Sequence, residues 1–275
     1  MLNAQRLGVQ DMKLSEEKIV ELYRTMEQKR PIVHCITNAV TVNDCANILL
    51  AVGASPTMAH HPMEAAEITQ GATSLVCNFG AIADYEAMLL AGRKAHELDH
   101  AIVVDPVGVS GSTYRREKCI EFIEAVHPTC IRGNYSEIRA LMENCTTITG
   151  VDAAPEDAHL DEQEAFLMRM KQYAKEKQMI IIASGETDLM TDGENTCACH
   201  RGDAMMAKIT GSGCMSSVML GAFLGVEKSF ASAAAAVTFM GMAGERAAAK
   251  TREIGGGTMT FRQLFIDEIY LLTNR

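Results

Sequence analysis

The chain has 275 residues, of which 48% are hydrophobic, and it carries a formal net charge of -10. This length and this apolar content suffice to bury a sizeable core, so we expect a globular protein. The negative charge and the lack of any Lys/Arg block argue against nucleic acids and anionic membrane surfaces as partners.

Nine cysteines are scattered along the sequence, which begins without a charged and then apolar signal segment. Disulfides belong mainly to secreted chains, so this pattern favours a reduced, cytoplasmic location. The longest apolar stretch, residues 229–244, is rich in alanine and shorter than a membrane span. We expect it to form a buried helix.

The sequence contains no repeat, low-complexity tract or linker, so a single domain over residues 1–275 is expected. Residues 1–14 are expected to be a loose leader, because they show no clear periodicity. A first helix is predicted to start at Ser15, which suits an N-cap position. Apolar residues then recur at helical spacing, at Ile19, Leu22, Tyr23 and Met26.

Short apolar runs that end in polar or glycine residues recur along the rest of the chain. They cover residues 31–38, 74–80, 101–108, 129–134 and 179–186. Helical patterns lie between them, as in 136–143 and 162–177, and this alternation predicts a mostly parallel sheet with helices on both faces. Ligands of such sheets bind beyond the carboxyl ends of the strands, so residues that follow each run are the candidates.

The segment KITGSGCMSS (208–217) places a glycine turn before an apolar helical pattern. Gly211, Ser212, Gly213 and Cys214 would then lie at the amino end of a helix, where free N–H groups and the helix dipole favour an anion such as phosphate. The alternative is an ordinary glycine turn that happens to contain a buried cysteine. Neither a Walker A loop nor a GxGxxG fingerprint is present.

Charged residues follow two of the predicted strands. Asp105 comes directly after one strand, and Arg132 and Glu137 lie in the loop and first helical turn after another. Carboxylates suit a hydrated Mg²⁺ and arginine suits phosphate oxygens. The alternatives are that Asp105 starts a turn and that Glu137 sits at a favourable helix start. The hydroxyl of Ser184, after a third strand, would suit a nucleotide or a simple turn.

Six blocks together resemble the hydroxyethylthiazole kinase family. They are HCITNAVT (34–41), GASPTM (53–58), DPVG (105–108), IRGNYSE (131–137), SGETD (184–188) and ITGSGC (209–214). The resemblance spans roughly residues 30–265. It implies a ribokinase-like three-layer α/β/α sandwich, ATP as phosphoryl donor, Mg²⁺, and 4-methyl-5-(2-hydroxyethyl)thiazole of thiamine salvage as acceptor. It also implies a homotrimer with active sites at the subunit interfaces.

The resemblance also implies roles for individual residues. Arg132 and Ser184 would contact ATP, Asp105 and Glu137 would organise metal and phosphates, and Cys214 would sit beside the substrate hydroxyl. The residues around the thiazole would be Asn38, Val40, Met58 and Gly211. Relatives usually have threonine where this chain has Ser184, and serine keeps the hydroxyl group. In the wider ribokinase-like fold an aspartate commonly occupies the position of Cys214, and a cysteine there resembles the thiazole-kinase branch.

Phosphoryl transfer depends more on positioning and charge neutralisation than on a strong base, so a thiol can serve as proton acceptor. Placement at a helix amino terminus predicts a lowered pKa for Cys214. Alternatives from related chemistry are a hydroxymethylpyrimidine or pyridoxal kinase. From other classes they are a hydrolase or acyltransferase with Cys214 as nucleophile, which requires an oriented histidine, and a silent nucleotide-binding subunit.

Two further features are expected to be structural. Cys197, Cys199 and His200 form the segment CACH without a second ligand pair, so an edge strand is expected there and not a zinc site. His34 lies inside an apolar run and is expected to pack or to form a local hydrogen bond.

Overall fold

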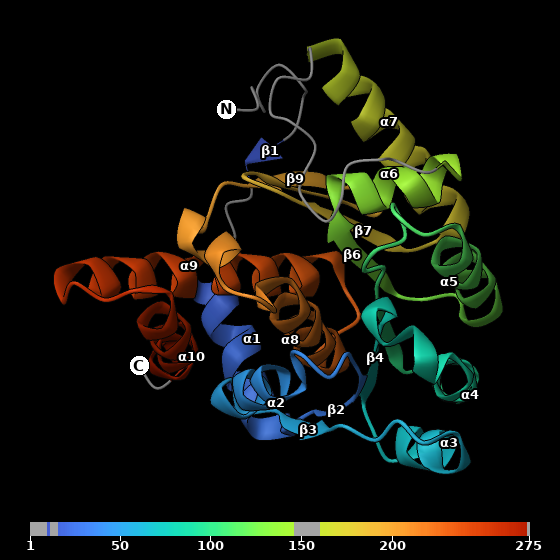
Figure 1. The fold of residues 1–275 in the computed structure, drawn as a ribbon, viewed down its shortest axis with the longest axis horizontal. Coiled ribbons are helices and arrows are strands. Elements are labelled where there is room, and N and C mark those ends of the chain that lie inside the picture. Colours follow the sequence, from blue (N-terminus) through green and yellow to red (C-terminus); the bar gives the residue numbers. More distant parts are fainter. Residues whose placement is uncertain (1–9, 12–15, 146–159, 274–275) are drawn as a thin grey trace.

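The computed structural model describes residues 10–11, 16–145 and 160–273. Its centre is a nine-stranded sheet in the order β1-β9-β8-β7-β6-β5-β4-β2-β3 (Figure 1). The strands are β1 (Gln10–Asp11), β2 (Ile32–Ile36), β3 (Ser55–Thr57), β4 (Ser74–Asn78), β5 (Ala101–Asp105), β6 (Cys130–Asn134), β7 (Ile180–Ser184), β8 (Asp188–Thr191) and β9 (Thr196–Cys199). Among these described strands, β8 alone runs antiparallel to its neighbours.

Helices cover both faces of this sheet (Figure 1). They are α1 (Glu16–Lys29), α2 (Val42–Ala51), α3 (Pro62–Gln70), α4 (Tyr85–Glu97), α5 (Thr113–Val126), α6 (Tyr135–Glu143), α7 (Leu160–Lys177), α8 (Ser212–Val226), α9 (Phe230–Glu253) and α10 (Thr258–Thr273). Short 3₁₀ helices span Phe79–Asp84 and Ala204–Lys208.

The alternation of side chains along the central strands builds two separate cores. On β5, Val103 packs with α1, α2, α8, α9 and α10, whereas Ile102 and Val104 point to the other face and pack with α3 to α7. A strand that is buried on both faces has to be apolar throughout, which explains the uninterrupted hydrophobic runs in the sequence. The predicted three-layer α/β/α sandwich with a mostly parallel sheet is confirmed.

Helix α8 lies unusually close to the sheet. A Cβ atom on Gly221 would lie 2.5 Å from Cγ2 of Val76 and 3.0 Å from Cγ1 of Val33, so no side chain fits between helix and strands at this point. The helix packs against β2, β4 and β5. This close packing fixes the amino end of α8 relative to the carboxyl ends of those strands.

The predicted elements agree with the structure apart from one position in the sheet. The first helix, the five central strands and the alanine-rich helix (α9) all form where they were expected. Segment CACH does form a strand, but β9 is not at the edge, because β1 pairs with it through Gln10 and Asp11. This pairing also involves part of the predicted leader, whose remaining residues lie outside the described ranges.

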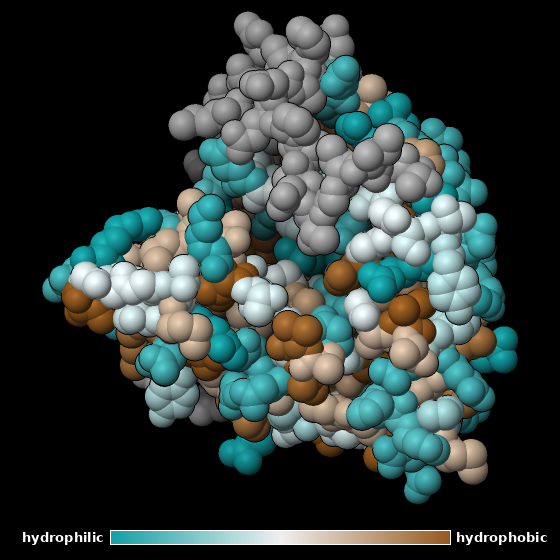
Figure 2. All heavy atoms as spheres, viewed as in Figure 1, coloured by the Kyte–Doolittle hydropathy of each residue, from teal (hydrophilic) through white to brown (hydrophobic). Residues whose placement is uncertain are grey.

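No described helix combines the length and hydropathy that crossing a bilayer requires. The face of the molecule shown in Figure 2 carries hydrophobic residues scattered among hydrophilic ones. All nine cysteines are free thiols, and eight of them are buried.

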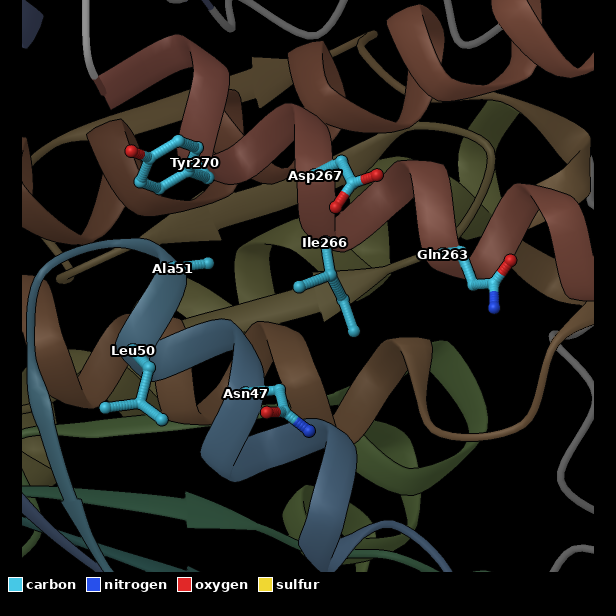
Figure 3. Close-up of a pocket in the computed structure, with 7 residues that line it drawn as sticks. All are labelled: Asn47, Leu50, Ala51, Gln263, Ile266, Asp267 and Tyr270. Carbon is cyan, nitrogen blue, oxygen red and sulfur yellow. The ribbon is translucent and has the colours of Figure 1, made fainter.

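A pocket of about 460 Å³ lies between α2 and α10 (Figure 3). Its lining residues are Asn47, Leu50, Ala51, Gln263, Ile266, Asp267 and Tyr270. None of these is among the residues that the sequence nominates for chemistry. The other end of α2 follows Thr41, a residue that borders the glycine turn before α8.

Candidate active site

The carboxyl ends of neighbouring parallel strands gather most of the predicted site residues at one edge of the sheet. Asp105 ends β5, Arg132 lies in β6 and Ser184 ends β7. Asn38 follows β2 by two residues. Asn78, which ends β4, is directly opposite Asp105 in the strand register. The amino end of α8 completes this cluster, because Cys214 in its first turn contacts both asparagines.

Gly211 sets the start of α8. Its φ of 88° lies in the left-handed region, and a Cβ there would lie 2.7 Å from Cγ2 of Thr41, so both conformation and space call for glycine. The first helical bond runs from the N–H of Met215 to the carbonyl of Gly211 at 2.8 Å. Among the described residues, no side chain caps the N–H groups of Ser212 to Cys214. They point beyond the helix end, as anion binding requires.

Arg132 supplies a positive charge next to this turn. A Cβ on Gly213 would lie 2.7 Å from Nη1 of Arg132, so the second glycine of the turn makes room for the guanidinium. In the described part of the chain, Arg132 forms no ion pair or hydrogen bond, and its donors remain available. Its charge opposes the rise in the pKa values of Asp105, Glu137 and Asp188.

Asp105 is buried, with 2% of its surface exposed. Its Oδ2 accepts hydrogen bonds from Nδ2 of Asn78 at 2.8 Å and from Oγ of Ser217 at 2.9 Å. Burial raises its pKa, while Arg132, Ser217 and Asn78 act in the opposite direction. Within the described ranges Oδ1 accepts no hydrogen bond. One oxygen is therefore held in place and the other is free.

Glu137 caps helix α6 reciprocally with Asn134. The N–H of Asn134 donates to Oε2 at 2.9 Å, and the N–H of Glu137 donates to Oδ1 of Asn134 at 2.8 Å. The N–H of Gly108 donates to Oε1 at 2.9 Å. Burial and the neighbouring Asp105 raise the pKa of Glu137 to about 7. The helix-start role considered for this residue is thus present, and metal binding stays a prediction.

The carboxylates suit a cation that takes most of its ligands from water and phosphate. Among the described residues, no three His, Cys, Asp or Glu side chains form a cluster that would hold a metal on its own. Mg²⁺ prefers one or two carboxylates together with substrate phosphates, and the free Oδ1 of Asp105 meets that requirement. Cys197, Cys199 and His200 likewise belong to no such cluster among the described residues. The imidazole Nδ1 of His200 lies 3.0 Å from Oγ1 of Thr187.

Cys214 is held by two amides. Its Sγ accepts hydrogen bonds from Nδ2 of Asn38 at 3.4 Å and from Nδ2 of Asn78 at 3.2 Å. Burial, followed by the charge of Asp105, raises the pKa of the thiol, and hydrogen bonds with the side chains of Thr41, Asn38 and Asn78 only partly oppose this rise. The prediction of a lowered pKa is therefore wrong: the helix end that favours a thiolate is outweighed by lost hydration and a buried carboxylate.

No histidine in the described ranges is hydrogen-bonded to the thiol. His34, which lies in the strand below, pairs through Nδ1 with Oγ1 of Thr69 and through Nε2 with the carbonyl oxygen of Ala59, both at 2.8 Å. This local bonding agrees with the structural role expected for His34. A Cys214 nucleophile with a histidine base therefore lacks its base in this arrangement.

The predicted thiazole residues lie at the same edge. Asn38 Oδ1 accepts the N–H of Val40 at 3.1 Å, and Gly211 contacts the next residue, Thr41. Val40 is 72% exposed, whereas Met58, just after β3, is half-buried against the core. The structure therefore brings Asn38, Val40 and Gly211 together at the turn before α2. Substrate contact by these four residues stays a prediction.

The predicted nucleotide residue Ser184 already uses its hydroxyl proton. Its Oγ donates to the carbonyl oxygen of Gly133 at 3.1 Å. The hydroxyl oxygen can still accept a bond, but a further donated bond to ATP would require exchange of this one. Contact between Ser184 and ATP stays a prediction.

The sequence reasoning missed three residues in this cluster: Asn78, Asp188 and Ser217. Asn78 and Asp188 lay inside segments that had been noticed, SLVCNFG and SGETD, and Asn78 met the rule that a polar residue ending a strand is a candidate. Loss of hydration raises the pKa of Asp188 to about 6, and Arg132 opposes this rise. Ser217 sits one helical turn after Gly213, a spacing that could have placed it on the same side of α8.

A buried carboxylate and an arginine at the carboxyl ends of parallel strands, beside a helix amino end, lie where α/β proteins bind their ligands. The nine-stranded sheet with helices on both faces has the ribokinase-like fold. A ribokinase-like superfamily protein from Enterococcus faecalis has the same fold, with a TM-score of 0.62 and 11% identity, over 95% of this chain and 90% of that one. At such low identity this likeness concerns the fold alone.

The chain belongs to the hydroxyethylthiazole kinase family, whose model matches residues 23–275. The hydroxyethylthiazole kinase of Clostridium beijerinckii is 40% identical over 260 residues, which cover 94% of this chain and 93% of that protein. The structure of the hydroxyethylthiazole kinase protein from Pyrococcus horikoshii gives a TM-score of 0.80 at 30% identity, with 93% of each chain covered. The family resemblance inferred from six sequence blocks is confirmed.

Proposed function

We propose that this protein transfers the terminal phosphoryl group of ATP to the hydroxyl of 4-methyl-5-(2-hydroxyethyl)thiazole, a reaction of thiamine salvage. Membership of the hydroxyethylthiazole kinase family makes the chain a kinase that phosphorylates an alcohol. The observation that carries the proposal is the cluster at the amino end of α8. There the thiol of Cys214, the carboxylate of Asp105 and the guanidinium of Arg132 meet backbone N–H groups that no side chain of the described ranges caps.

The N–H groups of Ser212, Gly213 and Cys214 would face the transferred phosphoryl group, and Arg132 would add positive charge beside them. A loose transition state gathers negative charge on the phosphoryl oxygens, so fixed donors there lower the barrier. Mg²⁺, held by Asp105 and Glu137, would supply further positive charge to the phosphates when bound. Ser184 would contact the nucleotide through its hydroxyl oxygen.

Cys214 would orient the substrate hydroxyl and accept its proton when the sulfur is ionised. Since burial raises the pKa of this thiol, most molecules of the empty protein carry the proton near neutral pH. The amides of Asn38 and Asn78 both donate to Sγ and so favour the thiolate within this buried site. Orientation of the hydroxyl is thus the larger part of the role, which suits a reaction that needs little base.

We also propose a homotrimer with substrate sites at subunit interfaces, in the cytoplasm. The support for the interface is Val40, a predicted thiazole contact that is 72% exposed in the single chain. A side chain that packs on an apolar ring needs cover from water, and a second copy would provide it. Free thiols at all nine cysteines support a reducing compartment. Light scattering after gel filtration measures the assembly, and a monomer at micromolar concentration would contradict it.

A coupled assay of ADP release tests the proposed reaction. Hydroxyethylthiazole is compared with hydroxymethylpyrimidine and pyridoxal, each with and without Mg²⁺. We expect ADP release that depends on the thiazole and on Mg²⁺, with phosphorylated thiazole as product by mass spectrometry. Faster turnover of either other alcohol would transfer the assignment to that substrate, and ATP binding without any product would leave a nucleotide-binding subunit.

A further inference from the structure

Asn78 occupies the centre of the cluster and uses its whole side chain. Its Oδ1 accepts the N–H of Gly80 at 2.8 Å and Nδ2 of Asn38 at 3.3 Å. Its Nδ2 donates to Oδ2 of Asp105 at 2.8 Å and to Sγ of Cys214 at 3.2 Å. An amide has two N–H donors and two good acceptor positions, so every one of them has a partner.

The orientation of this amide follows from its partners. The N–H of Gly80 can only donate, and it lies 2.8 Å from Oδ1, so the oxygen must face it. Both N–H groups then necessarily face Asp105 and Cys214. Asn78 is 1% exposed, which means that water cannot readily replace any partner that is lost.

We propose that Asn78 is a positioning residue that links Cys214 to Asp105, so that the sulfur and the carboxylate are held in one fixed arrangement. The inference deepens the proposed kinase function and rests on it for the catalytic consequence. Asn78 would donate an N–H group to Sγ, so that the sulfur stays a hydrogen-bond acceptor with its lone pairs in fixed directions. Its other N–H group would hold the buried carboxylate of Asp105 and keep that negative charge from approaching the sulfur directly.

Two neighbours show why this role belongs to Asn78. Asn38 also donates to Sγ but makes no bond to Asp105, and Ser217 donates to Asp105 but not to Sγ. In the described part of the chain, Asn78 alone donates hydrogen bonds to both groups. Removal of Ser217 therefore separates an effect on Asp105 from an effect on the link itself.

An amide is also the side chain that fits the charges. An aspartate at this position would keep an acceptor for the N–H of Gly80 but would lose both N–H donors. It would also bring a second carboxylate to the 2.8 Å contact with Asp105. Like charges and lost donors both disfavour a thiolate, so the pKa of Cys214 should rise.

The test compares Asn78→Asp with Ser217→Ala. The rate at which iodoacetamide alkylates Cys214 is followed against pH by mass spectrometry of the tryptic peptide 209–228, which contains no other cysteine. We expect the midpoint of the alkylation profile to move up by about one pH unit in Asn78→Asp, and by clearly less in Ser217→Ala. In the kinase assay we expect Asn78→Asp to lower kcat by roughly 10- to 100-fold, while KM for ATP changes little.

An unshifted midpoint in folded Asn78→Asp, or an equal shift in Ser217→Ala, would overturn the inference. Circular dichroism shows whether the variant folds. Should it not fold, Asn78→Ser gives the same comparison without an added charge, and an upward shift is again expected. The alkylation profile does not depend on the substrate, so a wild-type protein without thiazole-dependent ADP release would refute the proposed function while the role of Asn78 at the thiol would still be measured.

Discussion

The cluster around Asn78 and the pocket between α2 and α10 differ in the property that identifies a site for chemistry. The pocket has a volume of about 460 Å³ and is bordered by exposed side chains, among them Leu50 and Tyr270 (Figure 3). The cluster is recognised instead by charged groups that keep hydrogen-bonding capacity among the described residues: Oδ1 of the buried Asp105 and the guanidinium of the half-buried Arg132. Unused donors and acceptors in a buried place are costly for the fold and therefore point to a ligand more directly than a hollow does.

Among changes to the cluster, removal of the thiol of Cys214 should lower the turnover rate most. In Cys214→Ala the substrate hydroxyl loses its orienting acceptor, and we expect kcat to fall by roughly 10²-fold or more. Cys214→Asp should retain turnover, because a carboxylate can accept the same bond. Steady-state kinetics with hydroxyethylthiazole measures both. A kcat for Cys214→Ala equal to that of the wild type would remove the thiol from the reaction.

Removal of the arginine should be the next largest effect. Arg132→Ala takes away the positive charge that packs against Gly213, and we expect KM for ATP to rise and kcat/KM to fall by about 10- to 100-fold. Arg132→Lys keeps the positive charge but lacks the planar guanidinium, so its KM for ATP should lie between those of the wild type and Arg132→Ala. An ATP saturation curve that is unchanged in Arg132→Ala would contradict the assignment.

The pH dependence of Mg²⁺ use should show the state of Glu137. Because burial and Asp105 raise its pKa to about 7, protons compete with Mg²⁺ below that pH, and the Mg²⁺ concentration for half-maximal rate should fall as pH rises from 6 to 8. The pKa of Glu137 in the folded protein lies above its value in the unfolded chain. The contribution of this carboxyl group to the free energy of unfolding is therefore complete at low pH and is lost as pH rises through about 7. A Mg²⁺ requirement that is constant over this range would refute the metal role.

A change in the pocket should have the smallest effect. Gln263→Ala truncates an exposed side chain that lines it, and we expect kcat and KM to remain within about 2-fold of the wild type. A loss comparable to that of Arg132→Ala would mean that the pocket, and not the cluster, contains the reacting groups.

The fold could be predicted well because each local sequence pattern is typical of one kind of secondary structure. Strands buried on both faces are uninterrupted apolar runs, and the residues that end them necessarily share an edge of the sheet. The glycines of the turn before α8 likewise predicted a helix start. The antiparallel strand β8 carries no such signal, and the pairing of β1 with β9 joins residues that lie far apart in the sequence.

The site was predicted less completely, because its properties arise from contacts between distant segments. Asn78 and Cys214 are 136 residues apart, and neither segment on its own reveals their hydrogen bond. The sign of the pKa shift of Cys214 was missed for the same reason: the helix end is visible in the sequence, whereas the burial and the proximity of Asp105 are not. Both oxygens of Glu137 proved to be engaged by backbone N–H groups, which a motif match cannot show.

A crystal structure with a non-hydrolysable ATP analogue and hydroxyethylthiazole would show whether the amino end of α8 holds the phosphoryl group that is transferred. We expect the terminal phosphoryl group at the N–H groups of Ser212 to Cys214, and the substrate hydroxyl within hydrogen-bond distance of Sγ of Cys214. A triphosphate bound away from the amino end of α8, or a hydroxyl that approaches a different side chain, would contradict it.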